Sequence, residues 1–385
     1  MPTLTLPVSQ ARAFILARQF ISLPADDPLE VPRRLVGVQM QYDASVPVSL
    51  WTRSQALPSG WTEDAFLKQR SLVKTWSMRS TVHAHTAGDL PLVIAAIGPA
   101  HRKRFYHFWQ LYFGKGPEEV DALYAQIRAA LAGGPLTRRQ LHERVPALQG
   151  LPWSGWGVDV KGLAYHGELV FANYKQFALR EQWLGPDWQD WTEAGARAEL
   201  LRRYLRAYGP AAIAEYAYWS GQRISEARAQ VKALGDELIE LRLAGEDIPE
   251  NGQYLALAAD EQALRGPQPE PPPVALLPKF DALVMGWRER WRFEPAGFED
   301  RVHRPAGQVE ATVLLRGQIT ATWRLERQGR QAILQAFPFR PLAPEDQALI
   351  EEKMAAWLAY LGLPGRAEVK PAALASDTNP ATLKP

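Results

Sequence analysis

The hydrophobic pattern of the N-terminal part of the chain predicts helices that are followed by a hairpin. Apolar residues recur at helical spacing over residues 8–23, 31–41 and 63–69. Residues 72–84 instead alternate between polar and apolar side chains, which predicts two paired strands that turn at Arg79–Ser80. A winged-helix unit has this order of elements, in which helices are followed by a hairpin.

The same order recurs twice further along the chain. In the second stretch the predicted helices cover 121–131, 138–145 and 158–166, and the hairpin covers 169–179. In the third, the helices cover 193–208, 211–219 and 225–234, and the candidate wing strands cover 238–243 and 254–258. A Gly-Pro pair follows the first helix in both stretches, at Gly134-Pro135 and Gly209-Pro210. An internal repeat of this kind predicts tandem units.

The pattern changes after a proline-rich linker at 266–273, because the following segments have strand periodicity and only residues 345–360 read as a helix. We therefore predict a mainly α fold with β wings (α+β), built from tandem winged-helix domains and a C-terminal β-rich domain. The predicted boundaries are 1–115, 116–190 and 191–265 for the winged-helix domains, 274–365 for the β-rich domain and 366–385 for a disordered tail.

Composition removes several classes of function. The chain has no cysteine, which excludes disulfides, thiolate nucleophiles and cysteine-bound zinc. Its seven histidines are dispersed, so we expect neither a metal nor a cofactor. No run of about 18 apolar residues occurs, and the N-terminus does not read as a secretion signal, so we expect a cytoplasmic protein without a membrane span.

The charge is unevenly distributed, although the net charge is only +2. Residues 1–110 hold 12 basic and 7 acidic residues, a net charge of +5, whereas residues 111–260 carry −4. An anionic partner would therefore meet the N-terminal part first, and ordinary variation of surface charge is the alternative.

A basic and aromatic run at 101–109 has two interpretations. Arg102, Lys103 and Arg104 could contact phosphates while the neighbouring rings stack on bases. The same run could equally form a helix with an apolar face and a solvated basic face. From the repeated helix-turn-helix pattern alone, a DNA-binding protein and an all-α protein that never binds DNA stay equally open interpretations.

Three motifs, in order along the chain, carry a resemblance to a known family. They are Gly-Val-Gln-Met-Gln at 37–41 with Ser-Leu-Trp-Thr-Arg at 49–53, Leu-Val-Lys-Thr-Trp-Ser-Met-Arg-Ser-Thr-Val-His at 72–83, and Leu-Leu-Pro-Lys-Phe-Asp-Ala-Leu at 276–283 with Arg288 and Arg290 after it. Together they resemble motifs of the AlkZ-like winged-helix DNA glycosylases, over about residues 8–365. The chain departs from the family pattern at Ser80, where glycine is usual.

The resemblance implies three winged-helix domains and a β-rich domain in a C-shape around double-stranded DNA that carries alkylated bases. It implies hydrolysis of the N-glycosidic bond of alkylated purines, with Gln39 and Gln41 as the catalytic pair. The motifs and the basic run together supply the candidate DNA-binding or pocket-shaping residues: Trp51, Arg53, Arg79, Thr81 and His83 from the motifs, and Arg102, Lys103 and Arg104 from the run. A structural histidine and a surface ion pair are the alternatives for His83 and Arg79, and a structural role is favoured for Asp281 and Arg290.

Two amides suit this chemistry. Alkylation at N3 or N7 makes a purine cationic and a good leaving group, so the enzyme mainly has to place a water molecule. An amide offers one acceptor and two donors for that purpose. An aspartate would stabilise the developing cation better, so two glutamines predict a narrow substrate range.

The geometry of the motif sets a condition on this hypothesis. Residues two apart diverge on a helix but share a face on an extended segment, so Gln39 and Gln41 have to lie at a helix end, in a loop or in a strand. Asp43 is near enough in sequence to bond a glutamine or to add charge. No lysine accompanies the pair in the sequence, which favours a monofunctional glycosylase, unless Lys74 or another lysine folds nearby.

Two other functions stay open. A regulator or lesion sensor would bind DNA without releasing a base, and a resistance protein would sequester an alkylating small molecule without DNA. Helix-turn-helix regulators normally act as dimers. Three tandem units in one chain favour a monomer and so count modestly against a regulator.

Overall fold

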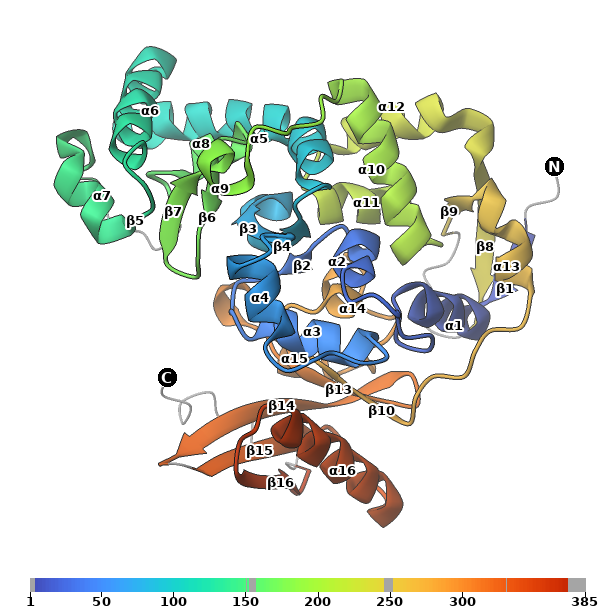
Figure 1. Ribbon diagram of the computed structural model, residues 1–385. Coiled ribbons are helices and arrows are strands. Elements are labelled where there is room, and N and C mark those ends of the chain that lie inside the picture. Colours follow the sequence, from blue (N-terminus) through green and yellow to red (C-terminus); the bar gives the residue numbers. More distant parts are fainter. Residues whose placement is uncertain (1–3, 150, 152–156, 246–251, 330, 373–385) are drawn as a thin grey trace.

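The computed structural model describes residues 4–149, 151, 157–245, 252–329 and 331–372 (Figure 1). Its N-terminal unit contains α1 (Val8–Arg18), α2 (Glu30–Leu35), α3 (Ser45–Arg53), α4 (Trp61–Leu67) and the strands β2 (Val38–Gln39), β3 (Leu72–Trp76) and β4 (Val82–Thr86). Strands β3 and β4 pair antiparallel from Leu72–Thr86 to Trp76–Val82. The hairpin predicted around Arg79–Ser80 is therefore confirmed.

The predicted helix over 31–41 is wrong in its second half. Helix α2 ends at Leu35 because Val36 and Gly37 both take positive φ, 58° and 105°. Gly37 has no room for a side chain, since a Cβ atom there would lie 2.6 Å from the His85 ring. The chain then enters β2, which pairs with β4.

The second unit begins with a long helix that the pattern did not show as one element, α5 (Leu90–Phe113). It continues through α6 (Pro117–Leu131), β5 (Leu136–Thr137), α7 (Arg138–Arg144), α8 (Lys161–Tyr165), β6 (Leu169–Phe171), β7 (Gln176–Leu179) and α9 (Arg180–Leu184). Thr137 caps α7 as predicted, because its hydroxyl accepts from the Gln140 amide at 3.3 Å. Helix α8 is shorter than the predicted 158–166.

The first two units share one sheet of six strands, in the order β2-β4-β3-β6-β7-β5. The connection is the pairing of Lys74 with Phe171, supported by a bond of 3.1 Å from the Thr75 hydroxyl to the Leu169 carbonyl. The two predicted wings are thus parts of a single sheet, and the predicted boundary at 115/116 does not separate two independent cores.

The third unit contains α10 (Glu193–Tyr208), α11 (Ile213–Ser220), α12 (Ile224–Leu234), β8 (Leu238–Ala244), β9 (Tyr254–Leu257) and α13 (Glu261–Arg265). Its three main helices agree closely with the sequence prediction. Strand β1 (Leu4–Pro7) comes from the N-terminus but pairs parallel with β8. The first residues of the chain therefore complete the sheet of the third unit.

The C-terminal part is built on a five-stranded sheet in the order β10-β13-β14-β15-β16. Its elements are β10 (Val274–Leu277), α14 (Ala282–Met285), α15 (Glu299–Val302), β11 (His303–Arg304), β12 (Gln308–Val309), β13 (Thr312–Leu315), β14 (Gln318–Gln328), β15 (Gln331–Pro338), α16 (Pro344–Tyr360) and β16 (Gly365–Val369). Strand β16 pairs parallel with β15, which corrects the prediction of a disordered tail from 366. Residues 373–385 of that predicted tail lie outside the described ranges.

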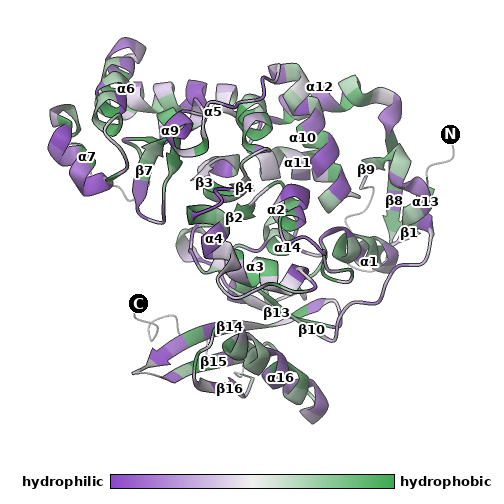
Figure 2. Cartoon of the chain, in the orientation of Figure 1, coloured by the Kyte–Doolittle hydropathy of each residue, from purple (hydrophilic) through white to green (hydrophobic). Residues whose placement is uncertain are grey.

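Hydrophobic packing ties the units together. One core cluster joins residues of α1, α5, α10 and α11 to residues 275–339. The hydroxyls of Tyr204 and Tyr208 on α10 donate to the carbonyls of Gly286 and Leu35, both at 3.0 Å. Figure 2 shows the peripheral helix α7 as largely hydrophilic, whereas the central strands contain hydrophobic and hydrophilic residues. The N-terminal motif residues therefore lie at the centre of the molecule, among all the units.

Within the described ranges, no helix is both long enough and apolar enough to cross a membrane. The helices and hairpins follow one another largely in the predicted order, whereas the winged-helix arrangement and the C-shape around DNA stay predictions.

Candidate functional site

Gln39 is the last residue of β2, and Gln41 follows it in a bend. The Met40 amide donates to the Val82 carbonyl at 2.8 Å, so the pairing with β4 continues past Gln39. Met40, between the two glutamines, is 1% exposed, and neither glutamine is part of a helix. The segment meets the geometric condition that the sequence set. Gln39 is buried, with 5% of its surface exposed, whereas Gln41 is exposed.

Arg79 fixes the amide of Gln39. Its Nη2 atom donates to the Gln39 Oε1 atom at 2.9 Å, and its Nη1 atom donates to the Trp219 carbonyl on α11 at 2.7 Å. The guanidinium thus connects the third unit to the motif. These partners are neutral, so Arg79 does not form the surface ion pair that was its alternative interpretation, and its contact with phosphate stays a prediction.

Arg79 and Ser80 lie in a tight turn between β3 and β4, the short 3-10 helix Met78–Ser80. Both residues have positive φ, 53° and 59°. This backbone region costs a residue with a Cβ atom about 1–2 kcal/mol, whereas glycine enters it freely. The geometry accounts for the glycine that the family resemblance leads one to expect at position 80. Ser80 keeps the turn and adds a contact of 3.2 Å from its hydroxyl to His101 Nδ1.

His83 faces the same side of the sheet as Gln39. It pairs with Gln39 on β2 and with Thr75 on β3. Its Nδ1 atom lies 3.2 Å from the Thr81 carbonyl, which can only accept, so Nδ1 carries the proton. Burial, and then the charge of Arg79, lower the pKa of His83 well below its ordinary value. His83 is therefore neutral at pH 7. The Thr81 hydroxyl bonds within the turn, to the Met78 carbonyl.

Lys74, the lysine that the sequence analysis named as the exception, does lie close to the motif. The Lys74 ammonium is 2.7 Å from the Asp43 carboxylate, two residues after Gln41. Lys74 is buried and also lies 4.9 Å from the centre of the Phe171 ring. Asp43 therefore pairs with a lysine and not with a glutamine of the motif.

Arg53 has a structural position, which corrects its predicted contact with DNA. Its side chain is 0% exposed and forms a two-bond ion pair with Asp281, at 2.7 and 2.9 Å. The structural role predicted for Asp281 is confirmed. Trp51 packs against Trp357 and Tyr360 of α16, with ring centres 5.1 and 6.3 Å apart. Both motif residues of α3 hold the N-terminal unit against the C-terminal part.

The basic run at 101–109 lies within α5, which confirms its helical interpretation. His101 and Trp109 are buried on one side, while Lys103 and Arg104 are exposed. Arg102 donates to the Tyr165 carbonyl at 3.0 Å, and Arg104 donates to the Gly221 carbonyl at 2.8 Å. DNA contact by these residues stays a prediction.

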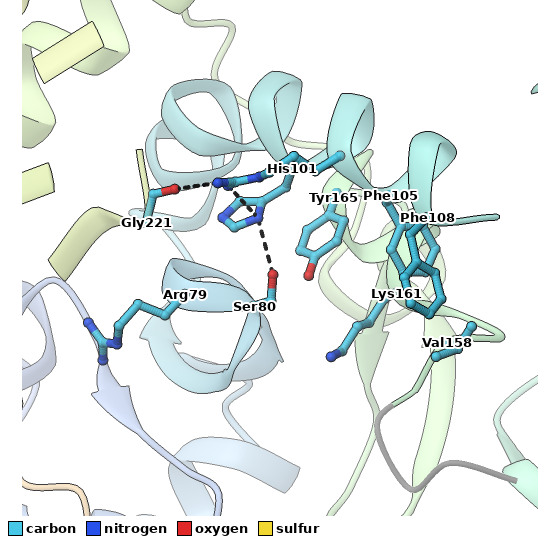
Figure 3. A pocket seen from close by; sticks show the side chains of 10 residues that line it. Arg79, Ser80, His101, Phe105, Phe108, Val158, Lys161, Tyr165 and Gly221 are labelled. Carbon is cyan, nitrogen blue, oxygen red and sulfur yellow. Dashed lines mark hydrogen bonds between the residues drawn. The ribbon is translucent and has the colours of Figure 1, made fainter. Parts of the chain in front are cut away.

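A pocket of about 540 Å³ opens beside the turn (Figure 3). The turn, α5, the segment around α8 and the turn after α11 line it with Arg79, Ser80, His101, Arg104, Phe105, Phe108, Val158, Lys161, Tyr165 and Gly221. Sequence reasoning missed this pocket because its walls come from distant segments. The available signal was Lys161, a lysine that begins an otherwise apolar stretch. Among the described residues, no group of three or more metal-ligating side chains is placed to hold a metal ion.

Comparison with known proteins agrees with these features. A family model described as DNA glycosylase AlkZ-like matches residues 33–360. A curated protein of Streptomyces sahachiroi, named interstrand DNA cross-link repair glycosylase, is 28% identical over 353 residues, which is 86% of this chain and 90% of that protein. The solved structure of Streptomyces sahachiroi DNA glycosylase AlkZ is similar with a TM-score of 0.78 at 25% identity, covering 94% of this chain and all of that one. Because the family model matches most of the sequence, this chain belongs to the AlkZ-like family of DNA glycosylases.

Proposed function

We propose that this protein is a DNA repair glycosylase that hydrolyses the N-glycosidic bond of alkylated, cationic purines, with Gln39 and Gln41 positioning the water. The observation that carries the proposal lies at the end of β2, where neither Gln39 nor Gln41 is part of a helix and Arg79 binds the Gln39 amide. Membership of a DNA glycosylase family supports the same reaction.

The two glutamines have different roles in this proposal. Gln39 is buried and bonded to Arg79, so its amide is oriented before DNA arrives. The Gln41 side chain is exposed and makes no hydrogen bond within the described part of the chain. Its carbonyl can accept a bond from water, while the second lone pair of Gln39 Oε1 accepts another. Such positioning is effective because the water need not be reoriented in the transition state.

The charges around the motif determine where the phosphate and the base of the substrate can lie. Arg79 puts a cation next to Gln39, which suits a DNA phosphate and disfavours a cationic base. We therefore place the alkylated base on the side of Gln41, away from the Arg79 guanidinium. A neutral amide is a weak base, so only a purine that is already charged leaves at a useful rate.

The direct test is release of free base from a duplex that contains N7-methylguanine. Wild-type protein is expected to release 7-methylguanine, and Gln39→Ala and Gln41→Ala are each expected to reduce the single-turnover rate by about 100-fold, because water is no longer positioned. Gln110→Ala, at an exposed glutamine on α5, is the matched control and should keep the wild-type rate.

DNA affinity is measured in parallel on the same duplex. Retained affinity with lost base release supports the catalytic assignment. Affinity without release by the wild type would instead identify a lesion-binding protein, and loss of affinity in the glutamine variants would remove their catalytic role.

Two further arms of the assay address scope and mechanism. A duplex with an interstrand cross-link tests whether the chain acts as the name of the Streptomyces relative indicates. Borohydride trapping tests the monofunctional mechanism, in which water and no lysine attacks the sugar. A covalent protein–DNA adduct that disappears in Lys74→Met would contradict it, since Lys74 lies near the motif.

A further inference from the structure

The pocket beside the Arg79–Ser80 turn has an aromatic part and a cationic part. Phe105 and Phe108 of α5 stack 6.1 Å apart, and Figure 3 shows them with Val158 at one end of the pocket. Ser80 and His101 lie towards the other end, and Lys161 extends between the two. Its volume of about 540 Å³ lies in the range of small-molecule pockets, roughly 300–1,000 Å³. The pocket therefore has room for one ligand unit and not for a double helix.

The cations of this pocket have no acidic partners in the described structure. Arg79 and Arg104 donate only to neutral acceptors, namely Gln39, His101 and two backbone carbonyls. Lys161 is 9% exposed, and its ammonium makes no hydrogen bond or ion pair with described residues. The ammonium lies 6.0 Å from the centre of the Trp76 ring. Buried charges are normally paired, so an unpaired buried ammonium at a pocket wall points to an anion from outside.

Burial makes Lys161 sensitive to what enters the pocket. Desolvation and, less strongly, the nearby Arg138 lower its pKa to about 8 against the opposing effect of Asp159. Asp159 cannot serve as its dedicated partner, because its carboxylate bonds Arg138 at 3.3 Å and His142 at 2.9 Å.

His101 supplies a second unsatisfied group. Arg104 can only donate, so His101 Nδ1, 3.2 Å from Arg104 Nη2, is the acceptor and the proton lies on Nε2. That Nε2 atom is buried and has no hydrogen-bond partner. Burial lowers the pKa of His101 to about 3, so the ring is neutral and adds no charge.

We propose that this pocket binds one nucleotide, with its uncharged base against Phe105 and Phe108 and its phosphate on Lys161 and Arg104. An aromatic ring that carries an anion matches both parts of the pocket, and nucleotides are the ligands of this kind that a DNA-binding protein meets. The cations of Lys161 and Arg104 disfavour the cationic purine proposed as the substrate, so the site is distinct from that of the damaged base. It would accept a free nucleotide or a nucleotide of an unpaired strand.

The proposal is tested by calorimetric titration of the full chain at pH 7 and low salt. The probes are deoxyadenosine monophosphate, deoxyadenosine, inorganic phosphate and a tetramer of deoxyadenylate. The monophosphate is expected to bind at least about 10-fold more tightly than the nucleoside or phosphate, because each of these lacks half of the contacts. Tighter binding of the tetramer would identify strand DNA as the source, and tighter binding of the monophosphate would identify a free nucleotide.

Variants link binding to the pocket. Lys161→Met should weaken monophosphate binding by about 10-fold or more, the loss expected for one charge-assisted bond. Lys353→Met is the matched control and should leave binding unchanged. Lys353 is a partly buried lysine of α16, and its ammonium lies over the Trp51 ring of α3. Arg104→Gln provides a second test at an exposed position if Lys161→Met does not fold.

The proposal fails if the monophosphate does not bind, if it binds no better than deoxyadenosine, or if both pocket variants bind like the wild type. No lesion and no base release enter the measurement. A negative result here therefore leaves the proposed glycosylase activity intact, and an inactive glycosylase leaves this site intact.

Discussion

At the scale of residues, one guanidinium determines how the motif is presented. Arg79 has two well-formed bonds, one to Gln39 on β2 and one to the Trp219 carbonyl on α11. It also lines the nucleotide pocket. An arginine suits this position because its planar fork can hold two acceptors in fixed directions, which a lysine cannot do. We infer that Arg79 is a positioning residue for Gln39.

Arg79→Met is expected to lower the turnover number by about 10–100-fold with little change in KM, because Gln39 loses its fixed orientation while most DNA contacts remain. Arg79→Lys should recover only a part of this loss. The measurement is base release over a range of duplex concentrations. A variant whose KM rises while its turnover number stays unchanged would show that Arg79 binds DNA and does not position Gln39.

The buried histidines predict how stability depends on pH. Burial lowers the pKa of His85 to about 4 and that of His101 to about 3, against an ordinary value of 6.5. Between pH 6.5 and 4 the unfolded chain therefore binds protons that the folded chain does not. The contribution of these histidines to the free energy of unfolding is complete above pH 6.5. It falls as the pH decreases, by about 1.4 kcal/mol per histidine and pH unit.

Urea unfolding at pH 7, 6 and 5 measures this effect. His101→Gln removes one titrating group, so the free energy of unfolding of this variant should fall less steeply with acidification than that of the wild type. Equal slopes for the two proteins would mean that His101 does not contribute.

At the scale of elements, the turn between β3 and β4 combines backbone strain with function. Arg79 and Ser80 both occupy the left-handed region, where a Cβ atom is unfavourable. Such strain persists when the surroundings fix it, and here the strand pairing on both sides does so. The strained turn aims Arg79 at Gln39 and Ser80 at the pocket.

Ser80→Gly should be more stable than Ser80→Ala by about 1 kcal/mol, because both variants lose the hydroxyl contact to His101 but only glycine relieves the strain. Thermal and urea unfolding of the pair check this expectation. Equal stability of the two variants would show that the turn is not strained at this residue.

At the scale of the whole molecule, the N-terminal unit is connected to everything else. It shares a sheet with the second unit, and its strand β1 pairs with β8 of the third. The ion pair between Arg53 and Asp281 connects it to the C-terminal part. The motif residues of α3 therefore keep the units in a fixed arrangement around β2. This arrangement is what brings Trp219 and Gly221 to the Arg79–Ser80 turn.

Arg53→Met is expected to destabilise the protein by about 3–5 kcal/mol, because it leaves the Asp281 carboxylate buried without its cation. Arg265→Met is the control, since Arg265 forms an exposed pair with Glu261 and its loss should cost less than about 1 kcal/mol. Urea unfolding followed by tryptophan fluorescence gives both values. Similar values for the two variants would remove the structural role of Arg53.

Local pattern by itself determined most of the helices and hairpins, because the apolar period and the capping residues act over a few neighbours. Thr137 as a cap, α10 with both of its ends and the β3–β4 hairpin are of this kind. The three ordered motifs also identified the family from the sequence. The end of α2 at Leu35 was missed, since it depends on Gly37 meeting the His85 ring.

Only the tertiary structure decided which distant groups meet. Lys74 meets Asp43, Arg53 meets Asp281, and the walls of the nucleotide pocket come from four separate segments. Spacing along the chain carries no record of these contacts, because strand pairing across units and packing between helices bring them about. The pattern therefore gave the elements and the glutamines, and folding supplied the partners that orient them.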